Sequence, residues 1–169
     1  YGHLGSLDYV DKCKFYQHYQ TRLPLYKPYF MQTAKQYNLD WRLLAAIGYQ
    51  ESHWENEAVS PTGVKGLMML TNDTALQVGI TDRTDPVQSI SGGALYFQQQ
   101  LKKLPDRISD PDRIWFALAA YNVGFGHLQD ARILTRQQQL NPDKWLDVKQ
   151  ILPLLADEAW FPLTKYGYA

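Results

Sequence analysis

Cysteine is almost absent from this sequence, and Cys13 is the only one. No disulfide can therefore form within the chain, and cysteine usage does not indicate a redox compartment. Long apolar runs are also missing, and residues 1–5 have neither the basic start nor the apolar stretch of a signal peptide. We therefore expect any export signal or lipid anchor to lie outside this chain.

Neither sign of charge is in excess, because seventeen Lys and Arg residues balance seventeen Asp and Glu residues. Bulk charge thus gives no reason to expect a nucleic acid or an anionic membrane as the main partner. The four histidines, His3, His18, His53 and His127, lack the spacing of metal ligands, and no Cys/His pair is available. We expect no metal and no cofactor, and we expect His53 to be a surface residue.

Sustained strand-type alternation is missing too, whereas helix signals are frequent. The 169 residues, 45% of them hydrophobic, suffice for one compact domain with one core. Aromatic residues make up 14% of the chain and suit both core packing and stacking on sugar faces. We predict a mainly α fold, in which the segment 59–70 forms a short hairpin or an irregular loop.

Helix starts are marked by an N-cap residue followed by a proline suited to the first helical turn. This pair occurs three times, and we expect a helix after each of Asp85-Pro86, Asp110-Pro111 and Asn141-Pro142. Earlier helices are expected over residues 24–37 and from residue 41 onward, the latter capped by Asp40. Ile114 to Ala120 is apolar all round, which predicts a buried central helix that ends at Gly124.

The helix expected from residue 41 carries an acidic residue on its apolar stripe. At about 100° per residue, Glu51 lies almost directly below Leu44 and beside Ile47. Burial there disfavours the charged carboxylate and raises its pKa, which keeps a general acid protonated near neutral pH. The alternative is a structural role, in which Glu51 caps the end of the helix or pairs with Arg42 or Lys65.

Four ordered motifs resemble the signature of the lytic transglycosylase family. They are Gln50–Trp54 followed by Ala58–Leu70, Thr74-Ala75 with Gly79-Ile80, Asp85-Pro86 with Ile90 and Gly93, and Ala120–Gly124. In that family a Glu-Ser pair ends the catalytic helix, a Ser-Pro-x-Gly-Ala-x-Gly-Leu-Met-Gln loop follows, and an Ala-Tyr-Asn-x-Gly motif comes later. The resemblance runs from about Pro24 to Leu155.

The resemblance implies a lysozyme-like helical fold of the goose-type lysozyme and lytic transglycosylase kind, with a substrate cleft. It implies a peptidoglycan lyase that cuts the β-1,4 bond between N-acetylmuramic acid and N-acetylglucosamine without water and leaves 1,6-anhydromuramoyl products. Glu51 would be the single catalytic acid and base. The substrate's N-acetyl group would support the oxocarbenium-like state in place of a second carboxylate.

Three further residues gain roles from the resemblance. Ser52 would help to orient the N-acetyl group, although a serine at a helix end is equally often a cap. Tyr121 and Asn122 would hold Glu51 and the acetamido groups by hydrogen bonds. Their structural alternatives are a buried tyrosine and an ordinary asparagine at a helix C-terminus.

The segment from Gly66 to Met69 would form the substrate-binding wall of the cleft. Gly66, Leu67 and Met68 match the family loop, and the glycine would let the backbone approach a sugar closely. Met69 departs from the family pattern, because relatives commonly have glutamine there. A sugar contact that the glutamine amide makes in relatives is missing here, so recognition of the sugar at this position must differ. Met69 could instead belong to the core.

We expect residues 1–23 to be a connecting segment and 24–169 to be the catalytic domain. The stretches 48–54 and 131–142 resemble a membrane-bound subfamily whose members carry a periplasmic, solute-binding-like regulatory module before the catalytic one. This implies a periplasmic location with outer-membrane association through other parts of the parent protein. Glycan strands and muropeptides would be its partners, no nucleic acid would bind, and the domain would be a monomer.

Two features leave alternatives open. The Glu-x-x-x-Tyr-Val element that closes the active site in many relatives is not seen, so it is either truncated or replaced by Tyr166 or Tyr168. The function could also be that of a goose-type lysozyme-like hydrolase, which adds water, or of a glycan-binding regulatory module that has lost activity. The joint presence of Glu51, Ser52 and the Tyr121-Asn122 pair argues against the inactive module.

Overall fold

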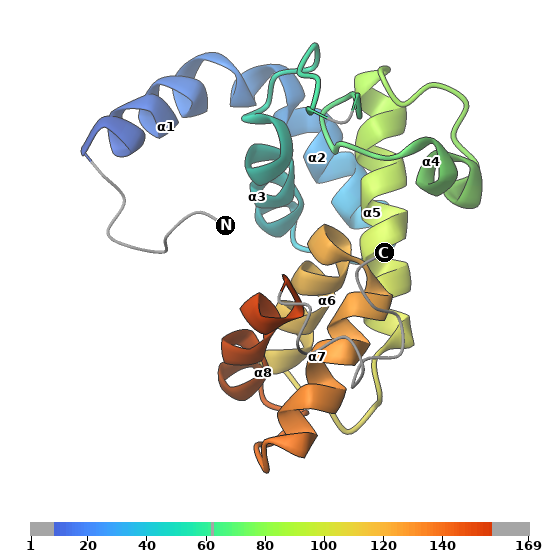
Figure 1. The fold of residues 1–169 in the computed structure, drawn as a ribbon. Helices are drawn as coiled ribbons and strands as arrows, with labels where there is room; N and C mark the ends of the chain where they lie inside the picture. Colours follow the sequence, from blue (N-terminus) through green and yellow to red (C-terminus); the bar gives the residue numbers. More distant parts are fainter. Residues whose placement is uncertain (1–8, 62, 157–169) are drawn as a thin grey trace. The chain divides into compact units, whose positions relative to one another are not determined.

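The computed structural model describes residues 9–61 and 63–156, and it confirms the mainly α prediction for them (Figure 1). The helices are α1 (Tyr9–Thr21), α2 (Leu23–Tyr37), α3 (Trp41–Ser52), α4 (Asn72–Val78), α5 (Pro86–Lys103), α6 (Asp112–Val123), α7 (Phe125–Gln137), α8 (Trp145–Ile151) and a 3-10 helix, η1 (Leu152–Ala156). The described residues include no strand, only isolated bridges within the predicted irregular segment 59–70. Tyr166 and Tyr168, the candidates for the closing element, lie outside the described residues.

The chain divides into two compact units, Tyr1–Leu95 and Tyr96–Ala169, with the boundary inside α5. In the first unit, α2 packs against α3. Phe30 of α2 is fully buried, and a Cβ on Gly48 of α3 would lie 3.0 Å from its ring. The small residue at position 48 therefore lets the two helices approach closely.

Helix α1 lies within the segment expected to connect domains, and it contacts α3. Phe15 meets the ring of Tyr49 edge-on at 5.0 Å, and His18 Nδ1 lies 3.3 Å from the Tyr49 hydroxyl. Tyr49 in turn packs at 4.6 Å on Trp54, whose Nε1–H donates to the Ala45 carbonyl at 2.8 Å. An aromatic cluster thus joins α1 to the end of α3, and the assignment of 1–23 as a connecting segment stays a prediction.

In the second unit, α6 packs against α7 and α7 packs against α8. Phe116 and Ala117 of α6 are fully buried, as the apolar run predicts, and Gly124 ends the helix with φ 89°. The prediction of a helix buried all round is wrong at Trp115, which is 48% exposed. One side of α6 therefore faces solvent although its sequence is apolar.

The predicted helix starts have mixed outcomes. Asp40 and Asp85 each accept a backbone N–H of the first turn, as expected, at 2.9 and 3.1 Å. After Asp110-Pro111, the helix begins at Asp112, and Pro111 occupies the N-cap position with no side-chain cap. The start predicted at Asn141-Pro142 is wrong, because the Asn141 side chain accepts from the N–H of Asp143 and forms a turn instead. Helix α8 follows later, from Trp145.

Candidate active site

Glu51 lies in the last turn of α3, next to the buried stripe formed by residues such as Leu44 and Ile47. Its side chain is partly exposed rather than buried. The ion-pair alternative with Arg42 is wrong, because Arg42 pairs with Asp40, with Nη2 and Oδ2 2.7 Å apart. Within residues 9–61 and 63–156, no ion pair to Glu51 is present, and none forms with Lys65.

Burial raises the pKa of the Glu51 carboxyl from 4.5 to about 7. Desolvation is the cause of this shift, and no charge or hydrogen bond from the described part of the chain contributes to it. The end of α3 is closed by backbone groups instead, with the N–H of His53 donating to the Tyr49 carbonyl at 2.8 Å. His53 itself is exposed, as predicted. The carboxyl is thus held in a site that favours its protonated form.

Ser52, the next residue, connects α3 to the loop that follows it. It is buried, and its hydroxyl oxygen lies 3.0 Å from the Gly48 carbonyl and 2.9 Å from the Leu67 carbonyl. A hydroxyl has one proton, so it donates to one of these carbonyls at a time. The contact to Leu67 joins residues 15 positions apart in the sequence, and it holds the loop against the end of α3, one residue after Glu51.

Replacement of Ser52 by alanine is expected to lower the free energy of unfolding by about 1–2 kcal/mol, because it removes the bond to the buried loop carbonyl. Denaturant unfolding measures this loss. The matched control is Thr21→Ala, which removes a hydroxyl that bonds a carbonyl one turn back at 2.7 Å on an exposed surface. Equal, small losses in both variants would show that Ser52 does not hold the loop.

The loop from Ser60 to Leu70 is organised by short local bonds. The N–H of Ser60 donates to the Val64 carbonyl and the N–H of Val64 donates to the Ser60 hydroxyl, both at 2.9 Å. Gly66 has φ 90°, and a Cβ there would lie 2.0 Å from the carbonyl oxygen of Arg83. The glycine is therefore required by close approach of the protein's own backbone, a reason that differs from the predicted approach of a sugar.

The side chains after Gly66 differ in exposure. Leu67 and Met68 are fully buried, so their side chains belong to the core and only their backbone could meet a sugar. A Cβ on Gly93 of α5 would lie 2.7 Å from Met68 Cε, so a glycine makes room for this methionine. Met69 is partly exposed, with φ 47°, and the hypothesis that it is a core residue is wrong.

Tyr121 and Asn122 lie in the last turn of α6, in the second unit. Tyr121 is partly buried and meets the ring of Tyr96 edge-on, with centroids 5.2 Å apart, whereas Asn122 is exposed. Burial also raises the pKa of the Tyr96 phenol. The roles predicted for Tyr121 and Asn122 toward Glu51 and the acetamido groups stay predictions.

Sequence reasoning missed the residues that hold the loop from the other side. The buried Ser89 hydroxyl accepts from the N–H of Met68 at 3.1 Å. The Arg83 guanidinium donates to the Leu70 carbonyl at 2.9 Å. The sequence offered one signal that the loop packs against α5, namely the run of small residues from Ser91 to Ala94. Small residues indicate a helix face that another segment approaches closely.

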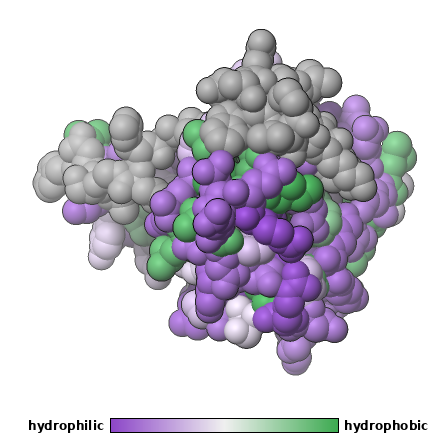
Figure 2. All heavy atoms as spheres, turned by 60° about the horizontal axis from the view of Figure 1, so that its bottom comes forward, coloured by the Kyte–Doolittle hydropathy of each residue, from purple (hydrophilic) through white to green (hydrophobic). Residues whose placement is uncertain are grey.

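The described residues contain no group of three or more His, Cys, Asp or Glu side chains placed to hold a metal ion. No helix among them is long and apolar enough to cross a bilayer. The face drawn in Figure 2 is mostly hydrophilic, and the hydrophobic residues on it lie in small groups.

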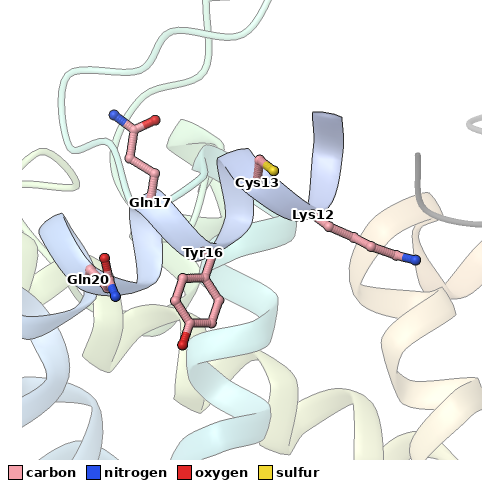
Figure 3. A pocket seen from close by; sticks show the side chains of 5 residues that line it. All are labelled: Lys12, Cys13, Tyr16, Gln17 and Gln20. Carbon is pink, nitrogen blue, oxygen red and sulfur yellow. The ribbon is translucent and has the colours of Figure 1, made fainter. Parts of the chain in front are cut away.

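A shallow hollow on α1 is lined by residues of that helix alone. Figure 3 shows these residues, among which Lys12, Tyr16 and Gln17 point to different sides of the helix. Their polar groups do not converge on one point, as the polar groups of a ligand site do. This hollow therefore suggests no ligand.

The comparisons with known proteins identify the family of this chain. Residues 28–144 match the family described as "Transglycosylase SLT domain". Over all 169 residues the chain is 59% identical to a protein of Stutzerimonas stutzeri (strain A1501) and 57% identical to one of Marinobacter nauticus, each named membrane-bound lytic murein transglycosylase F. It spans 35% and 34% of those relatives, respectively. The chain thus belongs to the SLT transglycosylase domain family and resembles the membrane-bound subfamily that its sequence predicts.

Proposed function

We propose that this chain cleaves peptidoglycan as a lytic transglycosylase, with Glu51 as its single catalytic acid and base. One observation carries the proposal: a carboxyl whose pKa burial raises to about 7 stands at the Glu-Ser position of the family signature. A group that must first donate and later accept a proton works best when its pKa is close to the working pH. Glu51 meets this requirement through burial, and among residues 9–61 and 63–156 it has no ion-pair partner.

In the proposed reaction, protonated Glu51 gives its proton to the glycosidic oxygen that leaves with N-acetylglucosamine. The carboxylate then takes the proton of the 6-hydroxyl on the same muramic acid, and that oxygen attacks C1 to form the 1,6-anhydro ring. Glu55, the next acid along the chain, pairs with Arg22, with 3.4 Å between Oε2 and Nη1. The proposal therefore assigns support of the oxocarbenium-like state to the N-acetyl group of the substrate.

The other site residues complete the proposal. Ser52 helps to orient the N-acetyl group, in addition to the contact that its hydroxyl makes with the loop carbonyl of Leu67. The backbone of Gly66, Leu67 and Met68 together with the Met69 side chain forms the wall that meets the sugar. Tyr121 and Asn122 hold Glu51 and the acetamido groups.

Residues 24–169 are the proposed catalytic domain, and residues 1–23 connect it to an N-terminal, solute-binding-like regulatory module of a periplasmic parent protein. The parent associates with the outer membrane through parts outside this chain. This domain is proposed to act as a monomer on glycan strands and muropeptides. The relatives' name, "membrane-bound", and their greater length support a larger parent protein.

Mass spectrometry of murein digested by the chain tests the proposed function. A 1,6-anhydro end on the released muropeptides is the expected product. A reducing end would instead identify a goose-type, lysozyme-like hydrolase. Intact murein would identify a glycan-binding module without activity.

The rate of murein cleavage is expected to fall as pH rises through about 7, because only protonated Glu51 can donate to the leaving oxygen and its pKa is about 7. Initial rates of muropeptide release, measured on both sides of pH 7, check this. The exposed-site variant Glu57→Gln should keep the same profile, since Glu57 lies on the surface. A rate that continues to increase well above pH 7 would contradict the assignment of Glu51 as the acid.

A further inference from the structure

A second hollow lies in the second unit, between the start of α6 and the start of α8. Its volume of about 570 Å³ is within the range of about 300–1,000 Å³ that is usual for small-molecule sites. The residues that matter in its lining are Asp112, Trp115, Lys144, Trp145, Leu146 and Asp147. None of them is among the residues assigned to the active site.

Trp115 presents an unusual amount of aromatic surface to this hollow. It is 48% exposed, while its neighbours Phe116 and Ala117 are fully buried. In the part of the chain that the structure describes, Trp115 has no aromatic ring partner and its indole N–H makes no hydrogen bond. A flat apolar face and a polar donor are therefore both available to a ligand.

The polar groups of the hollow are held in place by the fold. Asp112 accepts the backbone N–H of Trp145 at 2.9 Å and lies 3.4 Å from the Lys144 ammonium. Asp147 accepts the backbone N–H of Asn141 at 2.8 Å. These contacts hold both carboxylates in place before any ligand arrives, so ligand binding costs little conformational entropy of these two side chains.

The second indole is fixed as well. Trp145 meets the buried ring of Phe116 edge-on, with centroids 5.8 Å apart and planes at 87°. Helix α7 supports the preceding turn, because Arg132 Nε donates to the Pro142 carbonyl at 3.0 Å. The hollow is therefore a preformed combination of indole rings, two carboxylates and one ammonium group.

This combination fits an uncharged saccharide. A pyranose ring has an apolar C–H face that can stack on the exposed indole, and hydroxyl groups that can donate to carboxylates. An acetamido carbonyl can accept from the Lys144 ammonium or from the Trp115 indole N–H. Two carboxylates against one ammonium disfavour a phosphate or a nucleic acid.

We propose that this hollow binds a saccharide unit of a glycan strand, as a second contact in addition to the active site. The proposal rests on the proposed function insofar as the saccharide belongs to murein. Because the substrate is a polymer, a second contact raises the local concentration of the strand at the enzyme without a new catalytic group. The hollow would thus contribute to retention on murein, and much less to cleavage of short fragments.

Indole resonances give a direct test in the Glu51→Gln variant of the full chain, titrated with the β-1,4 tetramer of N-acetylglucosamine. Saturable shifts of the Trp115 and Trp145 Nε1–H signals are expected, with Trp115→Phe used to assign the Trp115 signal. Trp115→Ala should abolish the shift of Trp145. Unchanged Trp115 and Trp145 signals at saturating tetramer would overturn the proposal.

Binding to insoluble murein sacculi gives the second measurement. Trp115→Ala should weaken retention about five- to tenfold, equivalent to roughly 1–1.4 kcal/mol, whereas Trp115→Phe should retain most of it. Leu76→Ala is the matched control, because Leu76 is a 77% exposed apolar residue outside the hollow. Equal retention of Trp115→Ala and Leu76→Ala would overturn the proposal.

The product assay separates this proposal from the proposed function. Anhydro products without any change at the two indoles would leave the proposed function standing and remove the second site. Intact murein together with saturable indole shifts would remove the proposed function and keep the second site. The hollow would then be a saccharide site on a domain without lytic activity.

Discussion

Murein cleavage is expected to fall at least ~100-fold when Glu51 is replaced by glutamine, the range that general acid catalysis supplies. The amide keeps the shape of the side chain but has no acidic proton to donate. Release of soluble muropeptides measures the loss. Glu57→Gln is the control, because it makes the same chemical change on an exposed glutamate of the same unit and should leave cleavage unchanged.

The same variant should be no less stable than the native chain, because a neutral amide avoids the desolvation cost of a partly buried carboxylate. Folding raises the pKa of Glu51 from 4.5 to about 7, so the folded chain binds this proton more tightly. The resulting stabilisation is fully present below pH 4.5 and is lost as pH rises through about 7. The two melting temperatures should therefore be similar below pH 4.5 and should separate in favour of the glutamine variant as pH rises through about 7. A constant difference would refute the pKa shift.

Local signals in the sequence predicted helix starts well where the cap and the helix are adjacent. Asp40 and Asp85 each accept an N–H within three residues, so local chemistry decides the outcome. Asn141 has the same kind of signal but uses its side chain for a turn, and its own N–H donates to Asp147, six residues later. The outcome of this competition depends on contacts beyond the dipeptide, such as the bond to Asp147, which the Asn-Pro signal does not contain.

The position of Glu51 was predictable because helical periodicity alone places it beside the buried stripe of α3. Its full environment was not, since the loop partners of this region come from distant positions. Ser89 accepts from Met68 across 21 positions, and Ser52 donates to Leu67 across 15. These bonds depend on how the loop folds back onto two helices, which no periodic signal encodes.

The methionine pair shows the same limit at single-residue scale. Met68 and Met69 are chemically identical, and the sequence suggested that Met69 could be the core residue. The structure buries Met68 completely, because Gly93 leaves room for its side chain, and leaves Met69 partly exposed. A space made by a glycine in another helix decides which of two neighbours enters the core.

Replacement of Gly66 by alanine is expected to lower the free energy of unfolding by about 3 kcal/mol or more, from positive-φ strain and overpacking together. The new Cβ would lie 2.0 Å from the Arg83 carbonyl oxygen, and the backbone at φ 90° already disfavours any side chain. Arg83 cannot move away freely, because its guanidinium also bonds the Leu70 carbonyl at 2.9 Å. Denaturant unfolding measures the loss, and murein cleavage by the folded fraction should fall with it.

Gly79→Ala separates the two causes of this loss. Gly79 also has positive φ, at 73°, but a Cβ there would meet nothing within 4 Å. Its replacement should therefore cost about 1 kcal/mol, the backbone strain alone. The excess cost at Gly66 then reports the close approach of the Arg83 carbonyl to the loop beside Glu51. Equal losses at both glycines would mean that the loop moves away from Arg83 at no cost, and that Gly66 does not fix its position.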